Sequence, residues 1–357
     1  MGGGERHLVD LVSGLQNRGH HLHAGLRPHS PLLAALAPEG SLIATLPLRN
    51  AFDVLSARRL AALVSREQIQ IIHAHLARDY PLAAYAARRN PNAKLIVTRH
   101  VLFPLNRLQR MVLAHAARVI AVSEAVARAL RAQALMAPEL IKVVPNGIDV
   151  DRLGQARAQF DDQSFRARWN LPQDHLLIGS VGEIRPLKGH SDFLRAAALI
   201  VSRIPNSYFL IAGVDPSRSG EHQAALEKLI VELQLSNKVR LFGWLDDLPS
   251  FYCALDVFVS ASHSESFGLA IAEALACGAP VVATRTEGAE EILSPESSGT
   301  LVPVRDVEAL AQAVCTLLED PGGNRLANAG SETVRQRLSL SRMIERTEEV
   351  YQEALQS

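Results

Sequence analysis

Short apolar segments alternate with amphipathic segments along the chain. In the first half, residues 7–19 (HLVDLVSGLQNRG) have helical periodicity and end at Gly19, a residue type that commonly ends helices. Helices are also expected at 56–67 and 79–89. The pattern predicts strands at 20–26, 70–74, 94–98, 119–122 and 142–144. Strands that alternate with helices in this way predict parallel sheets covered on both faces.

The second half repeats the same scheme. Its predicted strands lie at 176–182, 208–213, 239–242, 257–260, 280–284 and 299–302. Residues 148–174 are polar and poor in β-branched side chains, so we expect an interdomain linker there. A final helix is expected at 341–356. The pattern therefore predicts an α/β protein with doubly wound domains at 1–155 and 156–340, followed by a C-terminal helix at 341–357.

The start of the chain departs from this scheme. The segment MGGGERH reads as a glycine loop, including Gly3 and Gly4, that leads directly into a helix. In a βαβ unit such a loop follows a strand, and in the usual strand order that strand lies in the middle of the sheet. The first domain is therefore expected to lack its first strand, through a misplaced start codon, a truncation, or replacement by another segment.

Composition limits the class of protein. Lysine and arginine equal aspartate and glutamate at 37 each, but residues 1–158 hold 20 basic against 10 acidic residues and the remainder holds 17 against 27. A basic half can bind phosphates or an anionic membrane, although surface charge also drifts between domains. Aromatic residues are few and no basic stripe is interleaved with them, so nucleic acid is not an expected partner.

The cysteines and the hydropathy pattern indicate a location. Cys253, Cys277 and Cys315 are odd in number, widely spaced and set in apolar segments, which favours buried free thiols in a reducing compartment. No apolar run reaches the ~18 residues that a membrane span needs, and no signal peptide is evident. We expect a cytoplasmic protein.

The most informative segment is SASHSESFGLAIAEALACGAPVVAT. A predicted strand ends just before Glu265, and a helix is expected to begin at residues 267–269. Glu273 follows Glu265 by two helical turns, so both carboxylates can face one cleft. Unpaired amides at the start of a helix bind phosphate, and Gly268 lets a ligand approach the backbone. Two carboxylates beside a phosphate site suit a nucleotide sugar, although this glutamate spacing alone is also common on solvated helices.

The whole segment resembles the E-x7-E motif of the GT4 glycosyltransferases, which have the GT-B fold of two facing Rossmann-like domains with a C-terminal helix packing back toward the first. Other segments match as well, among them GGGERHLVDLVSGLQNRGH, LIVTRH, VIAVSEAVARAL, KVVPNGIDVDRL and VGEIRPLKGHSDFLRAA. The resemblance implies that Glu265 contacts the donor sugar and Glu273 the ribose. It also implies that the amides of Phe267, Gly268 and Leu269 hold the sugar and diphosphate.

The VGEIRPLKG segment carries a departure from the family pattern. Lys188 follows a strand and a turn, where its ammonium group can neutralise a diphosphate. The family usually has arginine where this chain has Glu183, which replaces a cation by an anion. Arg185 is a candidate to compensate, and a solvated turn is the alternative for it.

Histidines form a second group of candidates. His100 ends a predicted strand, at the sheet edge where ligands bind in such folds, and the resemblance implies that it lies near the reacting sugar. His73 and His75 share one strand face and together with His100 invite a zinc interpretation. No cysteine or acidic ligand lies nearby in sequence and the set is incomplete, so no metal site is expected. Gly3 and Gly4 are expected near the donor phosphate or the acceptor.

The resemblance implies a retaining, metal-independent glycosyltransferase without a cofactor. Its donor would be a nucleotide diphosphate hexose or N-acetylhexosamine, with UDP as the commoner base. A glycan, lipid-linked or lipopolysaccharide acceptor at the inner face of the plasma membrane would suit the basic first domain, and a small soluble acceptor is the alternative. A nucleotide-sugar epimerase and a catalytically impaired nucleotide-sugar binder are the competing hypotheses, and Glu183 favours the binder.

Overall fold

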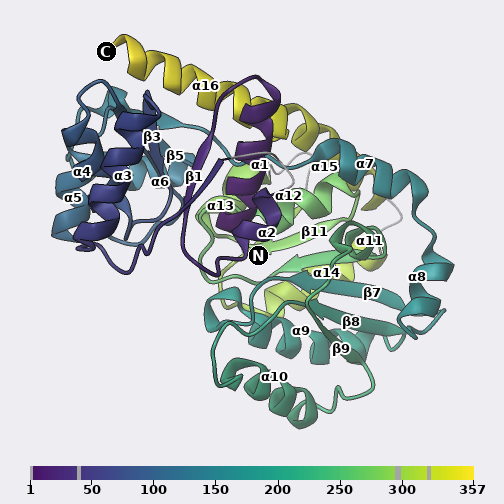
Figure 1. The fold of residues 1–357 in the computed structure, drawn as a ribbon. Helices are drawn as coiled ribbons and strands as arrows, with labels where there is room; N and C mark the ends of the chain where they lie inside the picture. Colours follow the sequence, from purple (N-terminus) through teal and green to yellow (C-terminus); the bar gives the residue numbers. More distant parts are fainter. Residues whose placement is uncertain (1–2, 38–41, 294–298, 320–322) are drawn as a thin grey trace. The chain divides into compact units, whose positions relative to one another are not determined.

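The computed structural model describes residues 3–37, 42–293, 299–319 and 323–357. It divides into two compact units (Figure 1). Unit 1 comprises residues 1–147 and 340–357, and unit 2 comprises 148–339. The division therefore falls between Gly147 and Ile148, whereas the sequence pattern placed it after residue 155.

Unit 1 contains six strands among the residues that are described. Its elements are α1 (Gly3–Asn17), β1 (His23–Leu26), α2 (Leu32–Leu36), β2 (Leu42–Thr45), α3 (Val54–Arg66), β3 (Ile71–Ala74), α4 (Tyr80–Arg89), β4 (Lys94–Arg99), α5 (Arg107–Leu113), β5 (Arg118–Ala121), α6 (Glu124–Arg131), a 3₁₀ turn (Pro138–Leu140), β6 (Ile141–Val143) and α16 (Leu340–Gln356).

The strands of unit 1 belong to two separate parallel sheets. One has the order β3-β4-β5-β6, and the other pairs β1 with β2. Within the described residues no strand joins β1 to β3. The four-residue strand β2 and the short helix α2 were not predicted, because segments of this length carry too little periodicity to be recognised.

Alternate side chains of β4 enter different cores. Leu95 and Val97 point to the face packed by α3, α4, α5 and α6, while Ile96 packs with Leu11 of α1 and Met343 of α16. Helices α1 and α16 lie against each other on this second face, close enough that a Cβ at Gly14 would meet the Ile344 side chain at 1.9 Å. The C-terminal helix thus packs on unit 1, as the GT-B resemblance implies.

Two expectations about the N-terminal part and the linker were wrong. Gly3 and Gly4 lie in the first turn of α1 instead of a loop, in a turn where Glu5 adds the negative charge that favours a helix N-terminus. The expected linker at 148–174 forms two helices of unit 2. Asp149 and Asp161 cap these helices, and Leu153 and Phe165 are buried in the unit 2 core, which outweighs the polar composition.

Unit 2 follows the doubly wound scheme throughout. Its elements are α7 (Val150–Gln159), α8 (Asp162–Arg168), β7 (Leu176–Val181), a 3₁₀ turn (Pro186–Lys188), α9 (His190–Arg203), β8 (Ser207–Ala212), α10 (Glu221–Glu232), β9 (Val239–Gly243), α11 (Leu248–Cys253), β10 (Val257–Ser260), α12 (Leu269–Ala276), β11 (Val281–Thr284), α13 (Glu287–Ile292), β12 (Thr300–Val302), α14 (Val307–Glu319) and α15 (Gly323–Arg337).

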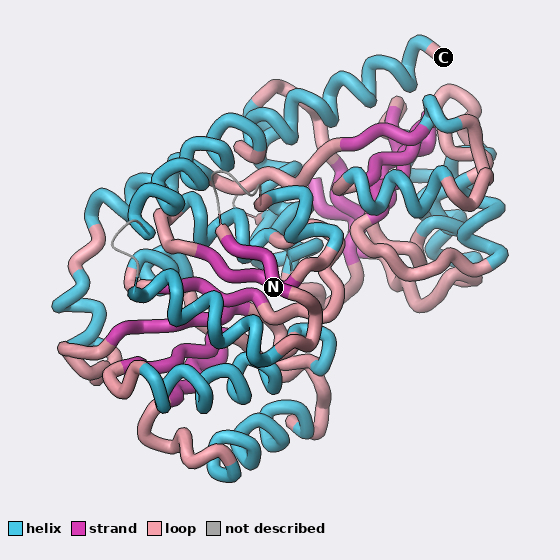
Figure 2. Tube along the Cα trace, turned by 180° about the vertical axis from the view of Figure 1, so that it is seen from behind, coloured by secondary structure: helices cyan, strands magenta, loops and turns pink. Residues whose placement is uncertain are grey.

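The sheet of unit 2 is fully parallel, with the order β12-β11-β10-β7-β8-β9. Helices cover both of its faces (Figure 2). Leu177 and Phe258 enter a core with α11 and α12, whereas their neighbours Ile178 and Val257 enter a core with α9 and α14. The strands are therefore buried on both sides, which explains why they appear in the sequence as continuous apolar runs.

Two further observations concern the remaining expectations. The three cysteines are free, with Cys277 and Cys315 buried and Cys253 partly buried. Among the described residues, no helix has the length and apolar character that crossing a membrane requires.

Candidate active site

The strand order of unit 2 reverses between the neighbouring strands β7 and β10. The chain runs from β7 outward to β8 and β9, and then returns to the other side of β7 to form β10, β11 and β12. In open α/β sheets, ligands bind beyond the carboxyl ends of the two strands where the order reverses. Residues 182–189 follow β7 and residues 261–268 follow β10, so both segments lie at this position.

Lys188 and Glu265 meet at this switch point. Lys188 ends the 3₁₀ turn after β7, and its Nζ lies 2.6 Å from Oε2 of Glu265, which follows β10. The two side chains are 29% and 20% exposed, so solvent and a ligand can reach both. A Cβ at Gly182 would lie 3.4 Å from Cδ of Lys188, which shows that the lysine stem crosses the end of β7. The fold therefore pairs Lys188, which was expected to bind the diphosphate, with Glu265, which was expected to bind the sugar.

Arg185 forms an ion pair with Glu183. Its Nε lies 2.8 Å from the Glu183 carboxylate, and both side chains are largely exposed. The unusual glutamate therefore neutralises the nearest arginine, and Lys188 remains paired with a different carboxylate. In this arrangement Arg185 does not supply the compensating charge expected of it.

The segment after Glu265 adopts the backbone conformation that its glycine requires. Gly268 caps α12 with a φ of 98°, a left-handed conformation that other residues adopt rarely. The Phe267 side chain is buried in the unit 2 core, and Leu269 begins the helix. Phe267, Gly268 and Leu269 thus form a rigid helix start, and its amides are in the position that phosphate binding uses.

Helix α13 supports this segment through Gly288. The Gly288 amide donates to the Glu265 carbonyl at 2.9 Å, and a Cβ at Gly288 would lie 2.6 Å from the Phe267 backbone. Only glycine fits there. The sequence alone did not point to Gly288.

A second glycine holds the two switch-point segments together. Gly189, at the start of α9, has a φ of 67°, and a Cβ there would lie 1.9 Å from the carbonyl oxygen of Ala261. The His263 amide donates to the Leu187 carbonyl at 2.8 Å, and its Nε2 lies 2.7 Å from Asp192. These contacts fix the relative position of Lys188 and Glu265, and only the lysine and the glutamate were expected from the sequence.

Glu273 is more enclosed than the sequence pattern implied. It is 7% exposed and accepts a hydrogen bond of 2.9 Å from the hydroxyl of Tyr252 on α11, whereas Glu265 stays partly exposed. The two carboxylates thus differ in environment: the Glu265 side chain is accessible from solvent, whereas Glu273 is largely enclosed. Tyr252 was not recognised, because its partner lies on a different helix.

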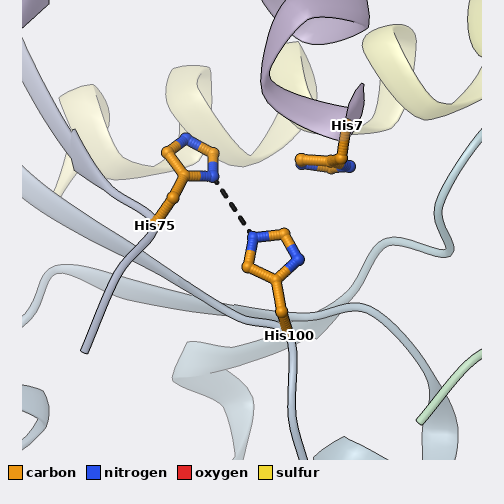
Figure 3. A group of neighbouring side chains, drawn as sticks. All are labelled: His7, His75 and His100. Atoms are coloured by element: carbon orange, nitrogen blue, oxygen red, sulfur yellow. Dashed lines mark hydrogen bonds between the residues drawn. The ribbon is translucent and has the colours of Figure 1, made fainter. Parts of the chain in front are cut away.

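His100 lies in a cluster of four histidines in unit 1. It follows β4, and its Nε2 lies 3.4 Å from Nδ1 of His75, which follows β3. His7 approaches both rings from α1, with centroids 4.8 Å from His100 and 5.7 Å from His75 (Figure 3). His73 lies on the same face of the sheet. Its Nδ1 forms a hydrogen bond of 2.6 Å with the Tyr351 hydroxyl, and its Nε2 forms one of 2.7 Å with the Thr98 hydroxyl.

Burial keeps these rings neutral. Burial lowers the pKa of His7 to about 4. Burial, together with the smaller effect of neighbouring histidines, lowers the pKa of His73 and His100 to about 3. The pKa of His75 is also lowered by burial and by the other rings. A neutral imidazole can accept a hydrogen bond from a sugar hydroxyl or bind a metal.

The sequence had placed His73, His75 and His100 together but not His7. Its position on an amphipathic helix, three residues after Gly4, gave no reason to connect it with strands that come much later in the chain. Gly3 and Gly4 lie one turn before it in α1.

Two family models match the chain. "Glycosyltransferase Family 4" matches residues 1–152, and "Glycosyl transferases group 1" matches residues 161–337. Both the acidic segment and the histidines thus fall within matched regions. The chain belongs to the glycosyltransferases of the GT-B fold, in the family 4 group.

Individual relatives agree with this class. The chain is 35% identical over 226 residues to a D-inositol 3-phosphate glycosyltransferase from Saccharomonospora viridis, a match that covers 61% of this chain and 51% of the relative. It is 25% identical to the N-acetyl-alpha-D-glucosaminyl L-malate synthase of Bacillus anthracis, over 85% of this chain and 80% of that protein. The chain thus spans about half the length of the first relatives that it matches.

Solved structures share the fold. The crystal structure of Anabaena Alr3699/HepE in complex with UDP and glucose superposes with a TM-score of 0.84, covering 98% of this chain and 95% of that one at 23% identity.

Proposed function

We propose that this protein transfers a hexose or N-acetylhexosamine from a UDP-sugar to an acceptor hydroxyl, with retention of anomeric configuration and without a divalent cation. The observation that carries the proposal is the meeting of Lys188 and Glu265 at the switch point of unit 2. Support for the nucleotide comes from the HepE structure, which is a complex with UDP and glucose.

Donor binding would exchange the partners of the ion pair. A diphosphate carries more negative charge than a single carboxylate, so it would attract Lys188 away from Glu265. The released carboxylate of Glu265 would then accept hydrogen bonds from the sugar hydroxyls. The amides of Phe267, Gly268 and Leu269 would hold the diphosphate, with the N-terminal end of the α12 dipole aligned with the negative charge.

Glu273 is proposed to contact the ribose. Its hydrogen bond from Tyr252 fixes the orientation of the carboxylate. Arg185, paired with Glu183, is proposed as a donor-binding residue only if the diphosphate displaces that carboxylate.

The transfer step would proceed on one face of the sugar. The bond between the anomeric carbon and the diphosphate oxygen breaks, and its electron pair leaves with the UDP. The acceptor oxygen forms a bond to the same face, and its proton passes to the departing phosphate oxygen. Lys188 and the helix amides would stabilise the negative charge that develops there, a task that a metal ion performs in other enzymes.

His100 is proposed to lie near the reacting sugar, where its neutral ring would accept a hydrogen bond from a hydroxyl. Gly3 and Gly4 are proposed to contribute to donor or acceptor binding through the start of α1. Both roles come from the family resemblance, and the buried, neutral state of the histidine ring is compatible with the first.

The acceptor is proposed to carry negative charge. Residues 1–158 hold twice as many basic as acidic side chains, and a field of this sign attracts anions. The two relatives have inositol 3-phosphate and L-malate in their names, and both are anions. A glycan, a lipid-linked acceptor or lipopolysaccharide at the inner face of the plasma membrane fits the same charge when it bears phosphate.

One observation favours an alternative. Glu183 neutralises Arg185, which leaves the donor site with fewer available cations than the family pattern has. A chain of this kind could bind a nucleotide sugar without transferring it. Turnover separates the two functions, because a binder would bind UDP and release no sugar.

The test begins with calorimetric titration of the full chain with UDP, GDP and ADP in the presence of EDTA. Micromolar binding of UDP, and weaker binding of the other two, is the expected result. The product of UDP-sugar and a phosphorylated acceptor is then followed by NMR. An anomeric signal that keeps the donor configuration supports the proposal, and an inverted signal contradicts it.

A further inference from the structure

Three histidines of unit 1 form a compact set of potential metal ligands. One ring nitrogen from each of His7, His75 and His100 lies within 4.8 Å of the other two. The three come from α1, from the end of β3 and from the end of β4, and their rings converge on one point (Figure 3). These histidines belong to unit 1, whereas the proposed donor site belongs to unit 2.

His7 is a buried histidine whose ring nitrogens are not satisfied by the surrounding residues that the structure describes. It is 6% exposed, and neither of its ring nitrogens has a hydrogen-bond partner of normal geometry among the described residues, although the nearby Asn146 side chain opposes the lowering of its pKa. Burial of an unpaired polar group is costly, so nearly all such groups in folded proteins have a partner. A ligand bound between the rings would provide one.

The neighbouring ring of His73 serves a different purpose. Its two nitrogens bond to Tyr351 of α16 and to Thr98 of β4. His73 therefore holds α16 on the sheet and has no nitrogen left for a ligand. The pair His73 and His75, which the sequence pattern offered as ligands, is split by the fold, and His7 takes the place of His73.

The distances suit a small, tetrahedral ion. Nitrogens bound at about 2.0–2.1 Å to a tetrahedral zinc ion lie about 3.3–3.4 Å apart. Nδ1 of His75 and Nε2 of His100 are separated by 3.4 Å. The nitrogen of His7 lies no more than 4.8 Å from those of the other two rings, so binding requires it to approach them by at most roughly 1.4 Å.

The chemistry of the ligands narrows the choice of metal. Three imidazoles without a carboxylate favour Zn²⁺ and its neighbours in the first transition row over Mg²⁺ or Ca²⁺, which prefer oxygen. Three histidines with an open fourth position are a ligand set that zinc adopts.

We propose that His7, His75 and His100 bind one divalent transition-metal ion, with Zn²⁺ as the best fit, and leave a fourth position for water or another donor. The ion would join α1 to the ends of β3 and β4. It would also hold the ring of His100, so that a bound metal and the sugar compete for this residue; that consequence rests on the proposed function, whereas metal binding itself does not.

The experiment uses the full chain without a polyhistidine tag, stripped with a chelator and free of nucleotide. Zn²⁺ is titrated by calorimetry and Co²⁺ by visible absorption, in which a tetrahedral site gives intense bands. We expect one ion per chain, no competition from Mg²⁺, and an affinity at least about tenfold lower in His7→Gln and His75→Gln. The control His21→Gln, at an exposed histidine, should bind as the wild type does.

Circular dichroism identifies any variant that fails to fold. If one of the two histidine variants does not fold, zinc binding by the other tests the proposal. A rise in the Tm of the wild type with Zn²⁺ that is absent from the folded variant supports the site. Absence of stoichiometric binding in the wild type, or unchanged binding in folded His7→Gln and His75→Gln, overturns it. Because no nucleotide is present, failure of UDP binding would contradict the proposed transfer and leave this result intact.

Discussion

The two units follow the same βα scheme but build their candidate sites from different chemistry. Unit 2 has one continuous six-stranded sheet, and its switch point holds a partly exposed ion pair between Lys188 and Glu265. Unit 1 has its described strands in two sheets, and the carboxyl ends of β3 and β4 carry neutral, buried histidines. Fixed charges bind a charged ligand, whereas neutral imidazoles accept hydrogen bonds or bind a metal.

The difference teaches what each unit can contribute to a reaction. A leaving diphosphate needs stabilisation of negative charge, which the Lys188 ammonium group of unit 2 can supply. The unit 1 cluster has no net charge at neutral pH, so it suits positioning of uncharged hydroxyls. Four experiments test the unit 2 site and the contacts that support it, in order of decreasing expected effect.

The largest effect is expected from Gly189→Ala, which disrupts the packing between the segments that follow β7 and β10 in unit 2. The new Cβ would lie 1.9 Å from the Ala261 carbonyl oxygen, in a backbone conformation with a φ of 67°. We expect a loss of at least about 3 kcal/mol in the free energy of unfolding and loss of UDP binding. Both tryptophans, Trp169 and Trp244, belong to unit 2, so their fluorescence during urea unfolding measures this unit.

Gly220→Ala is a matched control for this substitution. Gly220 also has a φ of 67°, but nothing lies within 4 Å of its Cβ position. Its expected cost is about 1–2 kcal/mol, from backbone conformation alone. Equal destabilisation by the two substitutions would mean that the packing of Gly189 on Ala261 is not what holds the switch point together.

The next effect concerns pH and His190 in unit 2. Burial lowers the pKa of this histidine to about 4, and the Gly182 carbonyl at 3.3 Å and the Glu183 backbone oppose the shift while Lys188 adds to it. The unfolded chain takes up the proton near pH 6.5, so the unit is fully stabilised above that pH. Stability is then lost as pH falls toward about 4, by up to about 3 kcal/mol.

The measurement is tryptophan-detected urea unfolding of the wild type and His190→Gln at several pH values between those limits. The variant should show a weaker pH dependence than the wild type. His222→Gln, at a partly exposed histidine of the same unit, should keep the wild-type dependence. An unchanged slope in His190→Gln would show that another group controls the acid sensitivity of unit 2.

A third experiment removes the charge of Glu265. Glu265→Gln keeps the shape of the side chain but weakens its bonds to sugar hydroxyls, so kcat should fall roughly 10- to 100-fold, or about 1.4–2.8 kcal/mol. Affinity for UDP alone should not fall, because Lys188 loses a competing carboxylate. Glu232→Gln, in the exposed pair with Lys228, should leave kcat unchanged. A wild-type kcat in Glu265→Gln would exclude this carboxylate from transfer.

The smallest effect is expected from Tyr252→Phe. The substitution removes the 2.9 Å hydrogen bond to buried Glu273 and should lower the free energy of unfolding of unit 2 by about 1 kcal/mol. Tyr208→Phe, at a partly buried tyrosine of β8, is the control. If the two variants are equally stable, the Tyr252 hydroxyl does not hold Glu273.

The sequence predicted the strands of unit 2 because long apolar runs with β-branched residues leave little ambiguity. It also led to the prediction that both Lys188 and Glu265 contact the donor, the lysine at the diphosphate and, through the family resemblance, the glutamate at the sugar. It did not predict that they pair with each other, or that Glu183 pairs with Arg185, because such pairs depend on side-chain distances that spacing does not define.

Other misses have a similar cause. Helices α7 and α8 look like a linker in composition, and only the burial of Leu153 and Phe165 reveals their place in a core. His7 joins the histidine cluster through the packing of α1 on the sheet, which no local pattern records. Tyr252 is likewise a contact between helices that are distant along the chain.

The most direct test of the central claim is calorimetric titration of UDP into the wild type, Lys188→Ala and Lys228→Ala with EDTA present. Lys228 lies in an exposed ion pair of the same unit, so its removal controls for the loss of one positive charge. The account predicts micromolar binding to the wild type and to Lys228→Ala, and binding weakened about 10- to 100-fold in Lys188→Ala. Equal affinity in all three proteins would contradict a donor site built on Lys188.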